Sequence, residues 1–173
     1  MSSADRLHQK ISNKYVDLNK IHEMYAFIPN EEQVRPSPEE KERKAKKLEE
    51  LAATWKEFID FIYATVFQLP HIEAKNGVKT VPNRYKEQMD KTQHVFQEQL
   101  FPYRIEDGRH FVMWYATKEQ KRSDEEITSD IEAELKAMTG TEDAFQFGWY
   151  VNPKMTVPEF FHVQVFVKVS CFD

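Results

Sequence analysis

The stretch of sequence that decides the fold lies near the C-terminus and reads FFHVQVFVKV over residues 160–169. Side chains of a β-strand point alternately to its two faces. One face of this stretch is therefore apolar, with Phe161 and the valines at 163, 165, 167 and 169. The other face carries His162, Gln164, Phe166 and Lys168. This alternation predicts a strand with an aliphatic core face and, on its opposite face, a histidine and a glutamine two residues apart.

Two further strands and one helix precede this strand. Residues 110–115 (HFVMWY) and 145–151 (FQFGWYV) are rich in aromatic and β-branched side chains, which favours strands. Between them, Ser123 and Glu126 form the capping box of a helix start. Gly140 supplies a C-terminal stop, so the helix is predicted to run from residue 123 to residue 139. The order strand, helix, strand, strand predicts an antiparallel sheet packed against this helix.

The first hundred residues are predicted to be mostly helical. Apolar side chains recur every three or four residues over 6–28, 38–69 and 85–100, as they do along one side of a helix. Asn76-Gly77 is a turn signal, and the neighbouring residues 78–81 are read either as a short edge strand or as a loop. The N-terminal half is therefore expected to contribute helices that cover the sheet.

The length and composition predict one α+β domain over residues 1–173, with a mainly helical part at 1–100 and a sheet part at 101–173. A chain of 173 residues supports one good core but not two full-sized domains. Thirteen Phe, seven Tyr and three Trp supply bulky core material. The 31% of charged residues is therefore read as a solvated surface and not as disorder.

The acidic excess is confined to the C-terminal part of the chain. Residues 1–100 carry 16 basic and 16 acidic side chains, whereas residues 101–173 carry 8 and 13. Affinity for nucleic acids comes largely from Lys and Arg side chains that replace condensed counterions. The sequence therefore disfavours a nucleic-acid partner.

Three observations bear on the compartment. No apolar run approaches the roughly 20 residues that span a bilayer, and the N-terminus lacks the hydrophobic segment of a secretory signal. Cys171 is the only cysteine, so no intrachain disulfide and no cysteine cluster for zinc can form. We expect an intracellular, cytoplasmic protein without a membrane span; an organelle or a virion remains as the alternative.

The strong enzyme motifs are missing, since the chain has no GxxxxGK, HExxH or GxSxG and only four glycines. Four segments carry a resemblance instead: FPY at 101–103, HFVMW at 110–114, WYVN at 149–152 and FHV at 161–163. Over about 70 residues they resemble an uncharacterised, mainly fungal family that includes the N-acetylglucosamine-induced protein. This resemblance implies no particular activity and no cofactor.

The same layout is more distantly similar to the histidine-triad and galactose-1-phosphate uridylyltransferase superfamily. That resemblance implies nucleotidyl transfer, in which His162 attacks an α-phosphate and forms a transient covalent intermediate. A neutral imidazole held by one ring nitrogen can attack through the other. Gln164 matches the third position of the uridylyltransferase branch, and Asn152 matches the upstream asparagine.

Two departures from the superfamily pattern weaken catalysis more than fold. Phe160 replaces the first histidine and can neither orient His162 nor donate to a phosphate. The segment 153–158 contains no glycine and loses two amide donors to proline. We therefore expect a non-catalytic binding or assembly protein, with a protein partner or a larger complex contacted through the helices at 6–28 and 38–69. The alternative is a divergent nucleotidyl hydrolase or transferase that acts on a nucleotide or another phosphate-containing small molecule.

Each candidate site residue also has a structural interpretation. His162 is the candidate catalytic residue, but the interpretation as a half-buried strand histidine bonded to a neighbour is favoured over a nucleophile. Gln164, Asn152, His110 and Trp114 are the candidate ligand-binding residues. His110 is also read as structural, and Trp114 as core or pocket wall, with base stacking as the alternative. A metal pair of His110 and His162 is conceivable, but no acidic third ligand is placed by spacing, so no metal is predicted.

Overall fold

The computed structural model describes residues 37–103, 105, 107–140, 145–152 and 157–168, together with residues 19, 22, 23, 28, 30 and 32. The helix predicted over 6–28 lies largely outside these described residues. The helices are α2 (Pro38–Thr54), α3 (Phe58–Thr65), α4 (Asn83–Gln88) and α5 (Asp124–Thr139). The strands are β1 (Ile72–Glu73), β2 (Lys79–Thr80), β3 (His94–Glu98), β4 (Gly108–Tyr115), β5 (Phe147–Tyr150) and β6 (His162–Lys168).

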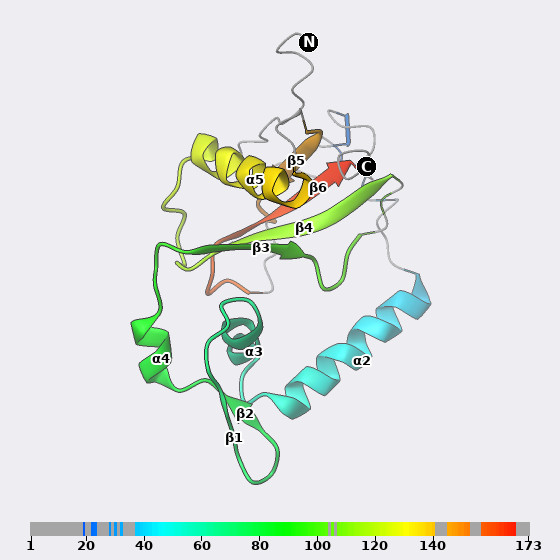
Figure 1. The fold of residues 1–173 in the computed structure, drawn as a ribbon. Helices are drawn as coiled ribbons and strands as arrows, with labels where there is room; N and C mark the ends of the chain where they lie inside the picture. The colour runs from blue at the N-terminus through cyan, green and yellow to red at the C-terminus, as the bar shows by residue number, and fades with distance from the viewer. Residues whose placement is uncertain are drawn as a thin grey trace.

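The larger sheet has four strands in the order β3-β4-β6-β5, and each neighbouring pair is antiparallel. The last strand in the sequence, β6, thus lies inside the sheet, between β4 and β5 (Figure 1). Its register places His162 opposite Trp114 and Gln164 opposite Val112. The prediction of an α+β protein with helices in the N-terminal half and an antiparallel sheet in the C-terminal half is confirmed.

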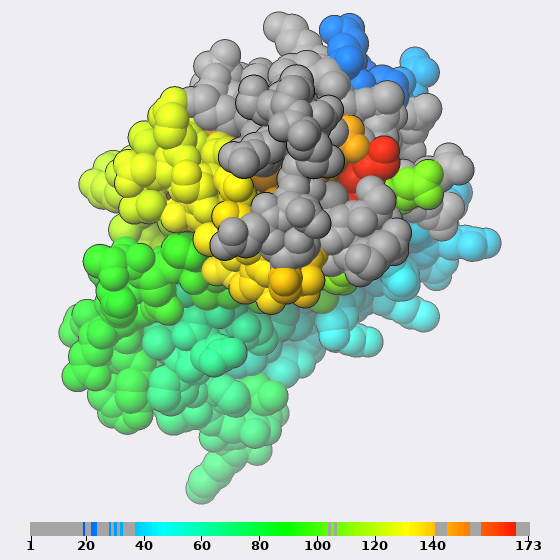
Figure 2. Space-filling view, turned by 45° about the horizontal axis from the view of Figure 1, so that its top comes forward, coloured from blue at the N-terminus to red at the C-terminus, as the bar shows by residue number. Residues whose placement is uncertain are grey.

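Helix α5 covers one face of the four-stranded sheet. Ser123 and Glu126 form the predicted capping box, and Gly140 ends the helix in the left-handed region at φ 69°. Ile127, Ile131 and Leu135 are fully buried against the face formed by Phe161 and the described valines of β6. The outward side of α5, yellow in Figure 2, forms part of the molecular surface.

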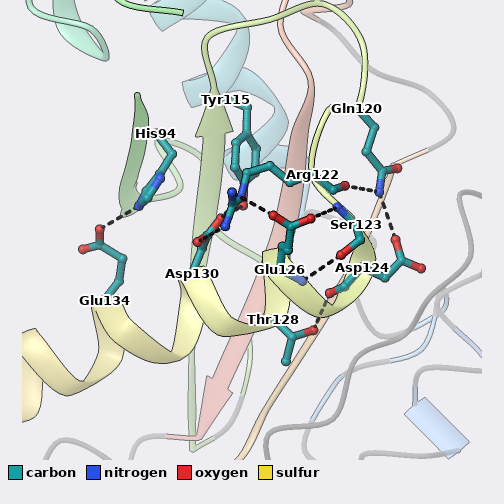
Figure 3. A network of polar contacts seen from close by, with 10 residues as sticks. All are labelled: His94, Tyr115, Gln120, Arg122, Ser123, Asp124, Glu126, Thr128, Asp130 and Glu134. Atoms are coloured by element: carbon teal, nitrogen blue, oxygen red, sulfur yellow. Dashed lines mark hydrogen bonds and ion pairs between the residues drawn. The ribbon is translucent and has the colours of Figure 1, made fainter. Parts of the chain in front are cut away.

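A polar cluster fixes the start of α5 to β4. Arg122 donates from Nε and Nη2 to the two carboxylate oxygens of Asp130, over 2.8 and 3.0 Å. The hydroxyl of Tyr115 donates to the same carboxylate over 3.0 Å (Figure 3). Burial, and after it the charge of Asp130, raises the pKa of Tyr115 above its ordinary value, so this hydroxyl stays a donor. The two-pronged Arg–Asp contact ties the loop before α5 to the helix, and the bond from Tyr115 ties the helix to β4.

The opposite face of the sheet, which carries His162, is also covered, in part by helix α3 of the N-terminal half. Ile62 of α3, the following Val66 and Phe67, and the loop residue Phe160 pack against Trp114 and Val112. Phe166, on the same face of β6 as His162, is fully buried. The four-stranded sheet is thus a middle layer between α5 and the α2–α3 region (Figure 1).

The single helix predicted over 38–69 is wrong, because the chain breaks it at Trp55. Trp55 has extended backbone angles, pairs with Lys79 as an isolated bridge and is buried. The next amide, of Lys56, donates to the carbonyl of Lys79 over 2.9 Å. These contacts replace the helical hydrogen bonds at this point, so α2 and α3 are separate helices. Lys79 belongs to β2, which pairs with β1 across the Asn76-Gly77 turn.

The helix predicted over 85–100 is also wrong. The chain forms the short α4 and then the edge strand β3, whose Val95 and Phe96 pair with Trp114 and Met113. Between them the carboxylate of Asp90 accepts from the amide and the hydroxyl of Thr92, at 2.9 and 2.6 Å. This local turn competes with helix formation. The apolar spacing of residues 94–98 fits a helix or a strand, and pairing with β4 selects the strand.

A buried ion pair joins the helical elements beneath the sheet. The carboxylate of Asp60 in α3 is almost fully buried and lies 2.7 Å from Nζ of Lys86 in α4. Its other oxygen accepts from the hydroxyl of Thr80 in β2 over 3.0 Å. The oxygen facing Lys86 has no hydrogen bond of good geometry, so the ion pair is what balances it. One side chain thereby links α3, α4 and the β1–β2 hairpin.

Candidate functional site

A cavity of about 520 Å³ lies between helices α2 and α3 and the sheet face that carries His162. We call it the α2–α3 cavity. Four of the five predicted site residues line it: Trp114, Asn152, His162 and Gln164. The fifth, His110, does not line it but contacts Gln164. The sequence alternation thus placed His162 and Gln164 on a common face, and the fold closes that face into a pocket.

The imidazole of His162 is held in one tautomer. Its Nδ1 lies 2.8 Å from the carbonyl oxygen of Phe160, which can only accept, so Nδ1 carries the proton and donates. Burial lowers the pKa of His162, and the bond to the carbonyl opposes this in part. The ring is therefore neutral at pH 7 with a lone pair on Nε2. None of the described residues is hydrogen-bonded to Nε2, and the ring of Trp114 lies 4.4 Å away, centroid to centroid.

The carboxamide of Gln164 is oriented by its neighbours. Nδ1 of His110 accepts from the backbone amide of Tyr103 over 3.1 Å, so the proton of His110 is on Nε2. Nε2 then donates to Oε1 of Gln164 over 2.6 Å, and Nε2 of Gln99 donates to the same oxygen over 3.0 Å. With its oxygen occupied by two donors, Gln164 has its NH₂ group left for a ligand.

Both ring nitrogens of His110 are engaged, so the metal pair of His110 and His162 considered from the sequence is wrong. Burial is the main cause that lowers the pKa of His110 to about 4, and the bond to Gln164 opposes it. His110 is therefore neutral and holds the carboxamide of Gln164 in place. Among the described residues, no group of three or more His, Cys, Asp or Glu side chains could hold a metal ion.

Sequence reasoning missed Gln99 and Tyr103 as supporting residues. Gln99 follows β3, which was read as helix, so its side chain could not be placed beside Gln164. Tyr103 lies within the FPY segment, but its role depends on its backbone amide and on its ring, 4.8 Å from that of His110. A side-chain pattern carries no signal for a backbone donor.

The walls of the α2–α3 cavity are mostly apolar. They include Leu48 of α2 and three residues of α3, Phe58, Phe61 and Ile62. Trp114 brings a buried indole N–H that has no hydrogen-bond partner among the described residues. Because that N–H is fully buried, Trp114 offers the cavity its ring and not its N–H. The floor of the cavity thus combines an aromatic surface with two polar groups of defined character, on His162 and Gln164.

Charged side chains lie only at the edge of the cavity, as far as the described lining residues show. These are Lys44 and Glu98, both solvent-exposed. Nζ of Lys44 lies 5.5 Å above the ring of Phe101, and Glu98 forms an ion pair with Arg109. The buried floor around His162 and Gln164 is therefore electrically neutral.

Comparisons with known proteins gave no relative: no family model, no curated protein and no solved structure matches this chain. The family resemblances seen in the sequence therefore stay predictions. In the part of the chain that the structure describes, no helix has the length and apolar character needed to cross a membrane.

Proposed function

We propose that this protein binds a small organic molecule in the α2–α3 cavity without turning it over. The observation that carries the proposal is the floor of the cavity, where His162 and Gln164 each bring one polar group whose hydrogen-bond role is set by its surroundings, beside the ring of Trp114. A mostly apolar pocket with a few convergent polar groups is typical of small-molecule sites. The volume of about 520 Å³ lies within the range of such sites.

The charge distribution supports binding over phosphoryl chemistry. A transferring phosphate needs donors or cations where charge develops, whereas the described floor is neutral and the described cation of the lining, Lys44, lies at the edge. The ring of Phe160 packs between Tyr63 and Phe67, with centroids 5.0 and 4.7 Å away. Phe160, which replaces the first histidine of the histidine-triad pattern, is thus part of the core.

The test uses the neutral fluorescent probe Nile red. We expect saturable one-site binding that Gln97→Trp removes, because Gln97 of β3 lines the cavity and the indole would fill it. Ile72→Trp is the matched control, since Ile72 is 53% exposed on β1 and does not line the cavity. Circular dichroism checks that each variant is folded. Absence of binding, or equal binding by wild type and Gln97→Trp, would overturn the proposal.

One observation favours nucleotidyl transfer as a second candidate function. The neutral ring of His162, with Nδ1–H held by a carbonyl and a lone pair on Nε2, has the electronic state that a histidine nucleophile requires. The test supplies adenosine 5′-phosphoramidate and a uridine diphosphate sugar. Release of the nucleoside monophosphate that His162→Ala abolishes in a folded protein would establish this activity and refute non-catalytic binding. No release with either substrate would remove the candidate.

Assembly with a protein partner stays a further prediction. It is supported by the exposed, charged surface of α2, in which Leu51 is the one buried residue. Light scattering of the purified protein tests it, and a lone monomer without a co-purifying partner counts against it.

A further inference from the structure

We infer that the ligand of the α2–α3 cavity is a planar lactam, a flat ring that carries an N–H donor beside a C=O acceptor. This inference rests on the proposed binding function and names the chemical class of the ligand. The cavity has an acceptor on His162 and a donor on Gln164. The hydrogen-bond role of each group is fixed by a contact on the opposite side of its side chain.

The acceptor of the cavity is Nε2 of His162. Because Nδ1–H donates to the carbonyl of Phe160 at 2.8 Å, the lone pair is confined to Nε2. A neutral acceptor held inside a buried site favours a ligand N–H, and it disfavours a carbonyl or carboxylate, which would meet lone pair with lone pair. The ligand therefore needs a donor at this point.

The donor that we assign to the cavity is the NH₂ group of Gln164. His110 and Gln99 occupy the Gln164 oxygen, so the carboxamide cannot turn its oxygen to the cavity without losing two hydrogen bonds. The ligand therefore needs at least one acceptor near its donor.

The spacing suits two heteroatoms of one ring. His162 and Gln164 are two residues apart on β6, which separates their Cα atoms by about 6.6 Å along a strand. Two hydrogen bonds of about 2.9 Å reach the N–H and the C=O of one lactam when the two side chains incline towards each other, which the lactam assignment requires.

The walls and the charges select a flat and neutral body. Phe58, Phe61 and Trp114 offer aromatic surface, which favours a planar ring. A carboxylate or phosphate placed on the neutral floor would lose its hydration without a counter-charge, at a cost well above that of a neutral amide. Lys44 and Glu98 lie at the exposed edge and do not offset that cost.

The experiment compares quinolin-2(1H)-one with coumarin, in which a ring oxygen replaces the N–H, on the full chain. The two molecules share shape and carbonyl, but only the first has the N–H that His162 would accept. We expect the parent lactam to bind at least about tenfold more tightly, as for loss of a hydrogen bond to a buried acceptor. We also expect it to shift the indole ¹H–¹⁵N resonance of Trp114, assigned with Trp114→Phe.

The variant His162→Leu removes the acceptor and should bring the two affinities to within about twofold. The comparison of the two ligands on the wild-type protein stands even if that variant fails to fold. Equal binding of both ligands to the wild type, or binding of neither, overturns the lactam assignment. Neither result decides the proposed function, which is tested separately by Nile red.

Discussion

At the scale of single residues, His110 is the histidine whose surroundings are most restrictive. One ring nitrogen accepts from the amide of Tyr103 and the other donates to Gln164. Protonation of the ring would turn the acceptor into a donor that faces another donor, in a site that is almost fully buried. The ring therefore resists protonation, in agreement with its pKa of about 4.

This predicts a pH dependence of stability. The folded-state pKa of about 4 lies below the ordinary value of 6.5, so between these values the unfolded chain binds more protons than the folded one. The contribution of His110 is complete above pH 6.5 and is lost as the pH falls towards 4, by about 3 kcal/mol in total. Urea unfolding at several pH values measures it.

The comparison variant is His110→Leu, which is less stable at pH 7 because the Tyr103 amide loses its partner. Its unfolding free energy should fall less steeply between pH 6.5 and 4 than that of the wild type. Equal slopes for the two proteins would show that His110 does not titrate in this window.

The polar face of β6 could be predicted residue by residue, but its partners could not. Strand alternation alone places His162 and Gln164 on one side. The bond between His110 and Gln164 depends on the register of β4 against β6, in which Val112 is directly opposite Gln164 and His110 is diagonal to it. Register is set by pairing across the sheet, which a single sequence does not display.

At the scale of the element, α5 was predictable because its signals are local. Ser123, Glu126 and Gly140 act within one turn of the helix ends, and the structure has all three in the expected roles. Trp55 shows the opposite case. Its apolar spacing continues the pattern of α2, but its buried contact with the β1–β2 hairpin breaks the helix. Distant contacts decided the conformation there, as they did for β3.

We predict that Ser123→Ala lowers the unfolding free energy by about 1 kcal/mol, because the backbone amide of Glu126 loses its hydrogen-bond acceptor, Oγ of Ser123. Ser123→Gly is the matched control and should cost only a few tenths of a kcal/mol. Thermal and urea unfolding give both values. A larger loss for Gly than for Ala would show that the cap does not stabilise α5.

The ion pair between Asp60 and Lys86 yields a second prediction at this scale. Lys86→Met leaves a buried carboxylate without a counter-charge and should cost about 3–5 kcal/mol. The double variant Asp60→Asn/Lys86→Met removes both charges, and the amide oxygen can still accept from Thr80, so it should recover much of that loss. Urea unfolding compares the three proteins. If the double variant is less stable than Lys86→Met, the cost does not come from the unpaired charge.

At the scale of the whole molecule, the sheet separates two regions that differ in how tightly they are packed. The side under α5 is a continuous apolar core, with Val163 and Val165 fully buried. The other side packs against α3 but leaves the α2–α3 cavity next to His162. The fold class followed from the order of the strands and of α5. The cavity did not, because it exists only where α2 and α3, separated at Trp55, stand over the sheet.

His162 and Gln164, the candidate site residues of β6, lie on an interior strand of the sheet. We expect this strand to open less readily than the other described elements. Its backbone is paired on both sides, with β4 and with β5, whereas α2 is mostly exposed. Amide hydrogen exchange should therefore be slowest along β6, near the rate of global unfolding, and much faster along α2. Similar rates in the two elements would contradict this ranking. A molecule that reaches His162 would then pass α2, which opens locally, and bind to β6, which opens only on global unfolding.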